Sequence, residues 1–201
     1  MRKVVCYAKR LKLIKHMKIK LLTITIFCIL FSCEKREQKK DTKENVSNTK
    51  VSTDDPKLEE LKTEASRLRA GGSIESVELI DRKATIAYVS NFNDYKEINP
   101  QSSLTESELK AYWESGDAIE KALVDGSVRI MRKLDFIDEV NIILPYEGEM
   151  YKISVNKSEL EKFIGTDFKS ITDNWDKTFS DPYVYNKKGR KAFFKKFGVV
   201  K

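Results

Sequence analysis

From Asp55 onward, apolar and polar residues recur with the periods of helices and strands. A first helix is predicted over residues 55–70, where Asp55 is a suitable N-cap, Pro56 takes the first helical position, and Gly71 and Gly72 end the pattern. Its buried stripe is predicted from four residues at helical spacing: Leu58, Leu61, Ala65 and Leu68.

Two hairpins are predicted on either side of a long helical segment. Four short stretches alternate apolar and polar residues, as strands with one buried face do: 74–80, 83–89, 140–146 and 150–155. Asp81 to Lys83 supplies the first turn, and Glu147 with Gly148 supplies the second. Pro145 marks a strand edge or terminus, because proline cannot donate to a ladder.

The helical segment between the hairpins carries the strongest local signal. Thr105 and Glu108 fit a capping box, and the apolar stripe behind them predicts a helix of about 30 residues. Two interpretations of the glycines in this segment remain open. Gly116 and Asp117 break the helix, with Asp117 and Glu120 as a second capping box, or the glycines permit close approach to the sheet.

The order of these elements predicts an α+β fold for residues 55–201. A short helix that starts near Ser158 and ends at Gly165 follows the second hairpin. We therefore expect a single two-layer domain, in which a four-stranded, mainly antiparallel sheet of two hairpins packs against one long helix. Residues 187–201 form its basic C-terminal tail.

The charge of the 201-residue chain, +7, is concentrated at its start. Residues 1–32 hold eight of the 38 basic residues and no acidic residue, which leaves 30 basic against 31 acidic residues from Cys33 onward. The remainder is close to neutral, so the charge is no reason to expect a nucleic-acid partner.

The basic leader has the pattern of a signal peptide. An apolar run from Leu21 to Ser32 is too short for a membrane helix, which needs about 20 residues. The segment "MKIK" at Met17 precedes it as a compact positive region, so we expect Met17 to be the true start. The run ends in "LFSC", residues 30–33, which resembles the lipobox of bacterial lipoproteins.

This resemblance covers residues 17–33 and implies a lipid anchor. In that class of protein the signal, here residues 1–32, is cut off and the cysteine, here Cys33, is acylated. An ordinary secretory signal and an uncleaved anchor helix are the alternatives. The resemblance implies a protein of the bacterial cell envelope, held in the outer membrane and facing the periplasm. Residues 33–54 are polar and charged, and we expect them to be a disordered tether.

Residue counts exclude several chemistries for such a mature chain. The only histidine, His16, and two of the three cysteines precede Cys33. Histidine-based catalysis, thiol catalysis, disulfides and zinc sites are thus not expected, and we predict neither a metal nor another cofactor. Carboxylate chemistry remains, and "DFIDE", residues 135–139, holds three acidic residues, although a solvated connection explains them as well.

Two segments near the C-terminus are candidate binding sites. The first, residues 172–185, is a candidate platform for a sugar or peptide: Asp173, Trp175, Asp176, Tyr183 and Tyr185. A loop whose aromatic residues pack on the core, and a calcium loop, are the alternatives. The second is a candidate contact with a membrane or an acidic polymer: Lys187, Lys188, Arg190, Lys191, Lys195 and Lys196. A terminal helix with solvated lysines, and a contact with nucleic acid, are its alternatives.

The sequence thus predicts a membrane-anchored envelope lipoprotein that acts as a non-catalytic binding module. Its partners are expected to be the membrane, through the lipid, and an envelope protein or polysaccharide. A carboxylate-dependent glycan hydrolase is the alternative function.

Overall fold

The computed structural model describes residues 55–201, and the predicted signal peptide, Cys33 and the tether lie outside the described residues. The helical elements are α1 (Pro56–Ser66), η1 (Gly71–Ser73), α2 (Phe92–Ile98), α3 (Glu106–Glu114), α4 (Ala118–Lys133), α5 (Lys157–Ile164), α6 (Phe168–Asp173), the π-helical segment η2 (Asp176–Tyr185) and α7 (Lys187–Phe197). The strands are β1 (Ile74–Ile80), β2 (Lys83–Tyr88), β3 (Glu139–Tyr146), β4 (Glu149–Asn156) and β5 (Gly198–Val200).

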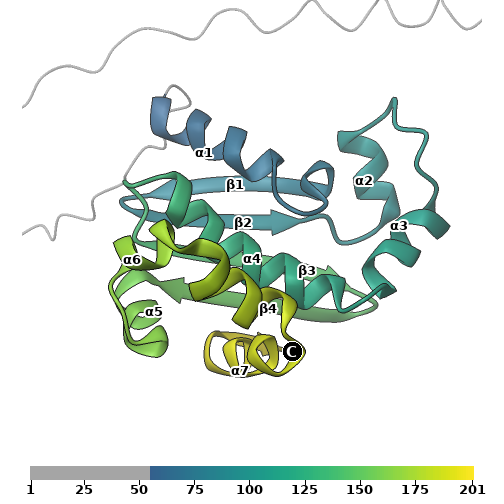
Figure 1. Ribbon diagram of the computed structural model, residues 1–201. Helices are drawn as coiled ribbons and strands as arrows, with labels where there is room; N and C mark the ends of the chain where they lie inside the picture. Colours follow the sequence, from purple (N-terminus) through teal and green to yellow (C-terminus); the bar gives the residue numbers. More distant parts are fainter. Residues whose placement is uncertain (1–54) are drawn as a thin grey trace, which may run out of the picture. The chain divides into compact units, whose positions relative to one another are not determined.

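The strands form one sheet in the order β1-β2-β3-β4-β5 (Figure 1). β1 with β2 and β3 with β4 are antiparallel hairpins, and β5 adds antiparallel to β4. β2 and β3 pair in parallel, so the two hairpins join side by side. The α+β class and the mainly antiparallel sheet predicted from the sequence are therefore confirmed.

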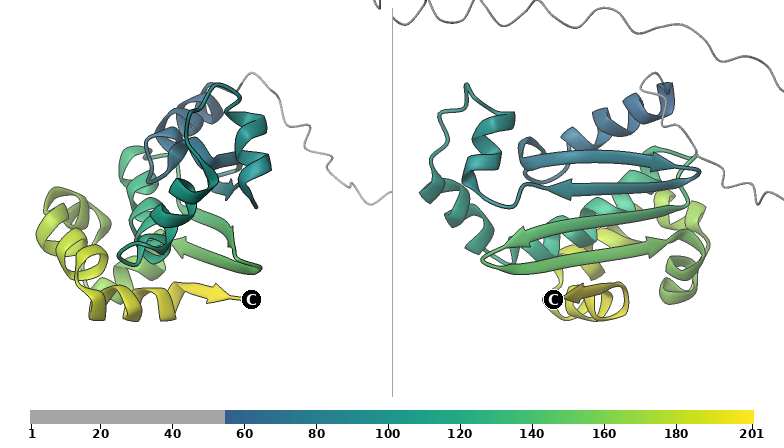
Figure 2. Two further views of the ribbon diagram at one scale, coloured as in Figure 1. Left: turned by 90° about the vertical axis from the view of Figure 1, so that its right-hand side faces the viewer. Right: turned by 180° about the vertical axis from the view of Figure 1, so that it is seen from behind.

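Helices cover one face of this sheet, and no described helix covers the other, which faces the viewer on the right of Figure 2. α4 packs on β3 and β4, α1 packs on β1, and η2 and α7 pack against α4. The buried side chains of neighbouring strands lie on the covered face, as in the pairs Val140–Val155 and Ile142–Ile153. This one-sided burial is common in antiparallel sheets and explains the alternating sequence.

Glycine in the middle of α4 brings this helix close to the sheet. A Cβ atom on Gly126 would lie 3.0 Å from Cδ1 of Ile142 in β3 and 3.4 Å from Cδ1 of Leu68. The close approach proposed for the glycines thus occurs at Gly126. Gly116 has a different role, because its φ of 52° belongs to the turn between α3 and α4.

The prediction of four strands and one long helix needs correction. The fifth strand, β5, follows α7 directly and was hidden in the basic tail. The long helix is two helices, since Gly116 and Asp117 both adopt left-handed backbone angles between α3 and α4. The first capping box, between Thr105 and Glu108, is confirmed. The second is wrong, because Asp117 makes no side-chain cap and binds Arg190 instead.

Candidate functional site

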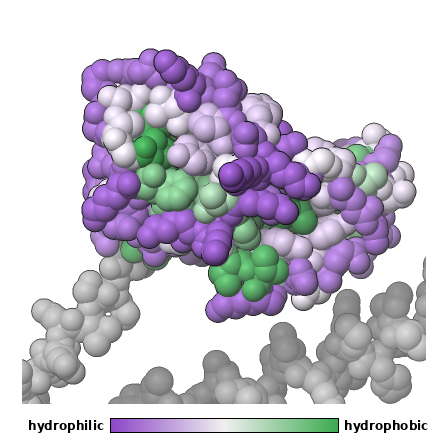
Figure 3. All heavy atoms as spheres, turned by 60° about the horizontal axis from the view of Figure 1, so that its bottom comes forward, coloured by the Kyte–Doolittle hydropathy of each residue, from purple (hydrophilic) through white to green (hydrophobic). Residues whose placement is uncertain are grey.

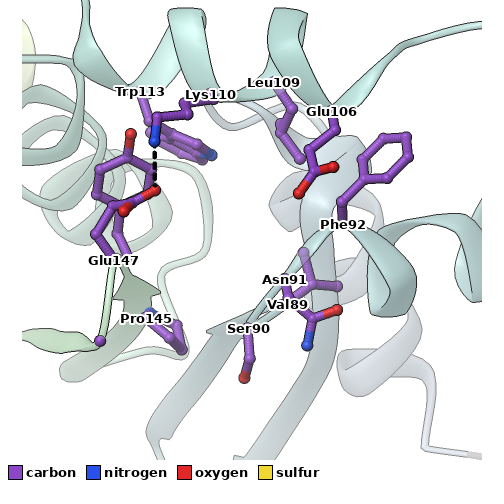
Figure 4. Close-up of a pocket in the computed structure, with 12 residues that line it drawn as sticks. Val89, Ser90, Asn91, Phe92, Glu106, Leu109, Lys110, Trp113, Pro145 and Glu147 are labelled. Atoms are coloured by element: carbon purple, nitrogen blue, oxygen red, sulfur yellow. Dashed lines mark hydrogen bonds and ion pairs between the residues drawn. The ribbon is translucent and has the colours of Figure 1, made fainter.

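A pocket of about 400 Å³ opens between α3, the β2–α2 connection and the β3–β4 turn (Figure 4). Val89, Ser90 and Asn91 reach it directly after β2, and Pro145 reaches it at the end of β3. These two strands are parallel, so their carboxyl ends meet at the same edge of the sheet. Ligands of α/β proteins commonly bind at such an edge.

Apolar side chains form much of the pocket wall. Val89, Phe92 and Leu109 line it together with Trp113, whose side chain is held between two other rings. The Trp113 ring lies edge-on to Tyr88, 5.7 Å between centroids, and to Tyr112, at 5.0 Å. The indole is therefore a fixed part of the wall, which suits a preformed binding site.

Polar side chains stand at the mouth of the pocket. Lys110 of α3 donates a hydrogen bond of 3.0 Å to Oε1 of Glu147 in the β3–β4 turn, and this bond raises the pKa of Lys110. The ion pair connects two walls of the pocket. Glu106, one turn before Lys110, faces the pocket from the opposite side to Glu147 (Figure 4).

The aromatic residues of the segment 172–185 do not form an open platform. Trp175 is buried, packs on Phe179 with 4.7 Å between ring centroids, and is covered by the guanidinium groups of Arg129 and Arg132. Tyr183 is half-buried, between the rings of other aromatic residues. Tyr185 alone is well exposed, at 61%.

The two acidic residues of this candidate platform, Asp173 and Asp176, do not form a shared site. Asp173 is exposed and forms an ion pair with Lys169 within α6. Asp176 is exposed at the start of η2. The structure thus brings the aromatic side chains together in the core and leaves the acidic ones on the surface. Among residues 55–201, no group of three or more acidic, histidine or cysteine residues is arranged to hold a metal ion.

The basic tail is an amphipathic helix, α7, docked on the domain. Lys187, Lys188, Lys191 and Lys195 are exposed and lie within one helix face, because residues four apart are neighbours on a helix. The side of the molecule that carries α7 is largely hydrophilic, with small hydrophobic groups between (Figure 3). Lys196 pairs with Glu159 at 3.7 Å. A contact with an anionic surface would use the first four lysines.

Arg190 has a different environment from the lysines of α7. Its side chain is buried, and it binds Asp117 and Glu120 at the start of α4. It also donates a bond of 2.6 Å to the carbonyl oxygen of Val184. This arginine therefore connects α7 to α4 and is not available to a membrane or a polymer.

Two of the three acidic residues of "DFIDE", Asp138 and Glu139, form structural ion pairs. Asp138 accepts bonds from Arg82 in the β1–β2 turn, one of them at 3.0 Å, and from Lys157 at 3.2 Å. The hydrogen bonds from Arg82, then those from Lys157, lower the pKa of Asp138 from 3.8 to about 2. Glu139 pairs with Lys83 at 2.7 Å. These contacts join the two hairpins at one end of the sheet.

The lowered pKa of Asp138 predicts an acid-dependent contribution to stability. Because its pKa is lower in the folded chain, the stabilisation is full above pH 3.8 and is lost as the pH falls towards 2. The side chain is 42% exposed, so we expect Asp138→Asn to cost only about 0.5–1 kcal/mol at neutral pH. Urea unfolding at pH 6 and pH 2 measures this. The difference between variant and parent should shrink at pH 2, whereas Asp181→Asn, at an exposed site, should change neither value.

The pocket residues were not recognised as a site from the sequence. Leu109 and Trp113 lie on the apolar stripe that predicts the long helix, and they also line the pocket. The pocket is assembled from three segments that are far apart in the chain, at residues 89–92, 106–113 and 145–148. The sequence feature that could have indicated the pocket is Gly116 after α3, because a helix that ends at this glycine need not run along the sheet.

Comparisons with known proteins identified no relative of this chain. The chain matches no protein-family model, and neither a curated protein nor a solved structure is significantly similar to it. Within the part of the chain that the structure describes, no helix has the length and apolar character needed to cross a bilayer.

Proposed function

We propose that this chain is a lipid-anchored protein of the bacterial cell envelope, and that its domain binds a ligand in the pocket between α3 and the β3–β4 turn. The observation that carries the binding role is the pocket itself, with a fixed tryptophan in its wall and charged groups at its mouth. Its volume lies in the range of ligand sites, about 300–1,000 Å³. The anchoring role is supported by the "LFSC" segment, residues 30–33.

The anchor is tested by labelling cells with palmitate. We expect the chain to incorporate label, and Cys33→Ser to abolish the incorporation because the acylated sulfur is removed. Cys28→Ser is the matched control, since this cysteine lies in the segment that would be cleaved. Label that persists in Cys33→Ser would contradict the proposed anchor.

The binding role is tested by closing the pocket. Ser90 is exposed at its rim, so Ser90→Trp fills the opening without disturbing the core. We expect this variant to lose the envelope component that the parent chain retains in a pull-down. Ser76→Trp makes the same change at an exposed serine outside this pocket and should retain the component. Equal retention by both variants would contradict binding in the pocket.

A carboxylate-dependent glycan hydrolase is the second candidate. Glu106 and Glu147 lie on opposite sides of the pocket, as the two carboxyl groups of such enzymes do (Figure 4). The general acid of a glycosidase is usually a carboxyl group whose pKa is raised by burial. Both glutamates are exposed here, and Glu147 already binds Lys110, which supports binding over hydrolysis.

A further inference from the structure

Some polar groups that line the pocket have hydrogen-bond partners within the domain, and others have none. Lys110 binds Glu147, and the Asn91 side chain caps α2 by bonding with Asp94. In contrast, neither the indole N–H of Trp113 nor the carboxylate of Glu106 has a hydrogen-bond or ion-pair partner within residues 55–201. Tyr146 also lines the pocket, and its buried hydroxyl has no hydrogen-bond partner in this part of the chain either. The pocket therefore presents unpaired donors and one anion that a ligand can engage.

The charges at the mouth favour a cationic ligand. Two carboxylates, Glu106 and Glu147, and one ammonium group, on Lys110, line the pocket. A third carboxylate, on Glu114, lies 3.9 Å from the Lys110 ammonium. The local charge is thus negative, which attracts a positive group and disfavours an anion.

The apolar wall favours a ligand whose positive group sits at the end of an aliphatic stem. Leu109 lies between the indole of Trp113 and the carboxylate of Glu106, Phe92 lies beside Glu106 on the side away from Trp113, and the opposite wall includes Pro145 (Figure 4). Lysine and arginine side chains bury their methylene stems against such surfaces and keep the charged end near water. A volume of about 400 Å³ has room for one or two side chains of a peptide.

We propose that the pocket binds a lysine or arginine side chain of a peptide segment from a partner protein. The positive group binds Glu106 beside Phe92, the stem packs against Leu109, and a peptide carbonyl accepts a hydrogen bond from the indole N–H of Trp113. This assignment rests on the proposed binding function and names its ligand class.

The experiment follows the indole resonances by NMR. The chain has two tryptophans, Trp113 and Trp175, so Trp175→Phe assigns them, and the buried Trp175 serves as an internal control. The sample is the chain from residue 33 with Cys33→Ser, which prevents acylation. The probes are three blocked dipeptides: acetyl-Leu-Lys-amide, acetyl-Leu-norleucine-amide and acetyl-Leu-Glu-amide.

We expect the lysine dipeptide to shift the Trp113 resonance and to leave that of Trp175 in place. Norleucine has the same stem without the ammonium group, so the norleucine dipeptide should bind about tenfold more weakly. The glutamate dipeptide should bind most weakly, because its carboxylate meets the negative mouth.

A variant isolates the contribution of Glu106. Glu106→Gln should weaken binding of the lysine dipeptide about tenfold and leave the norleucine dipeptide unchanged, because only the charge contact is lost. Glu60→Gln, at an exposed site on α1, is the matched control and should bind as the parent does.

Two results would overturn the assignment, and they have different meanings. Equal binding of the lysine and norleucine dipeptides would reject a basic side chain while leaving the pocket as a binding site. No shift of the Trp113 resonance with any dipeptide would reject a peptide ligand of this kind. The pull-down with Ser90→Trp decides separately whether the pocket binds at all.

Discussion

Arg190→Met is expected to lower the free energy of unfolding by about 2 kcal/mol, because it removes the buried side of an ion-pair cluster whose two carboxylates are partly exposed. Only 2% of the Arg190 side chain is exposed, and it binds Asp117, Glu120 and the Val184 carbonyl group. Without the guanidinium group, two carboxylates and one carbonyl oxygen are left facing an apolar side chain. Uncompensated groups of this kind cost more than the ion pair itself contributes.

Urea unfolding followed by circular dichroism measures this effect. Lys191→Met, on the next residue of α7 and exposed, is the matched control and should change stability by less than about 0.5 kcal/mol. Adding Asp117→Asn and Glu120→Gln to Arg190→Met should recover part of the loss, since both unpaired charges are then removed. Similar midpoints for Arg190→Met and Lys191→Met would show that the cluster contributes little.

Gly189→Ala is expected to destabilise the domain by about 3 kcal/mol or more, through a clash that only a movement of the backbone relieves. A Cβ atom at this position would lie 1.8 Å from the carbonyl oxygen of Pro182 in η2. Its φ is not in the left-handed region, so the glycine is required by close packing and not by its backbone angles. α7 would have to separate from η2.

Thermal unfolding provides the test, with a second glycine as the control. Around Gly72 no atom lies within 4 Å of an added Cβ, so Gly72→Ala should be neutral or stabilise the domain by up to about 1 kcal/mol. Melting temperatures that fall equally in both variants would mean that the approach of α7 to η2 is not tight.

Both predictions concern residues 187–201, which the sequence indicates mainly as a basic tail. Its lysines are as exposed as expected, yet Arg190 and Phe193 are buried among elements that precede them in the chain. The sequence alone does not distinguish a buried basic residue from an exposed one when the carboxylate partner lies far away in the chain. Glu120, which pairs with Arg190, precedes it by 70 residues. Deleting residues 187–201 would therefore remove part of the core together with the lysine face.

Local signals were sufficient for both hairpins and for the first capping box. The β3–β4 turn, for example, is specified by Glu147 and Gly148, which both take positive φ angles, and the strand register follows from the alternating residues. The elements that sequence reasoning missed are short or irregular. α2 has seven residues, β5 has three, and η2 contains Pro182, so none shows a sustained period.

The candidate site was harder to predict than the fold because it depends on non-local placement. Trp113 lies on the apolar stripe of α3, and only the positions of Ser90 and Pro145 make part of its surroundings a pocket. The parallel pairing of β2 with β3 brings those residues together. Hydrophobic periodicity describes which side of a helix is buried, but not which distant segment covers it.

That parallel pairing also determines how the chain is expected to fold. Each hairpin closes through a two-residue turn, so its contacts are local and form early. β2 and β3 are separated in the chain by α2, α3 and α4, and their pairing has to close a loop of some fifty residues. We therefore expect the union of the two preformed hairpins, and not the formation of either one, to limit the folding rate.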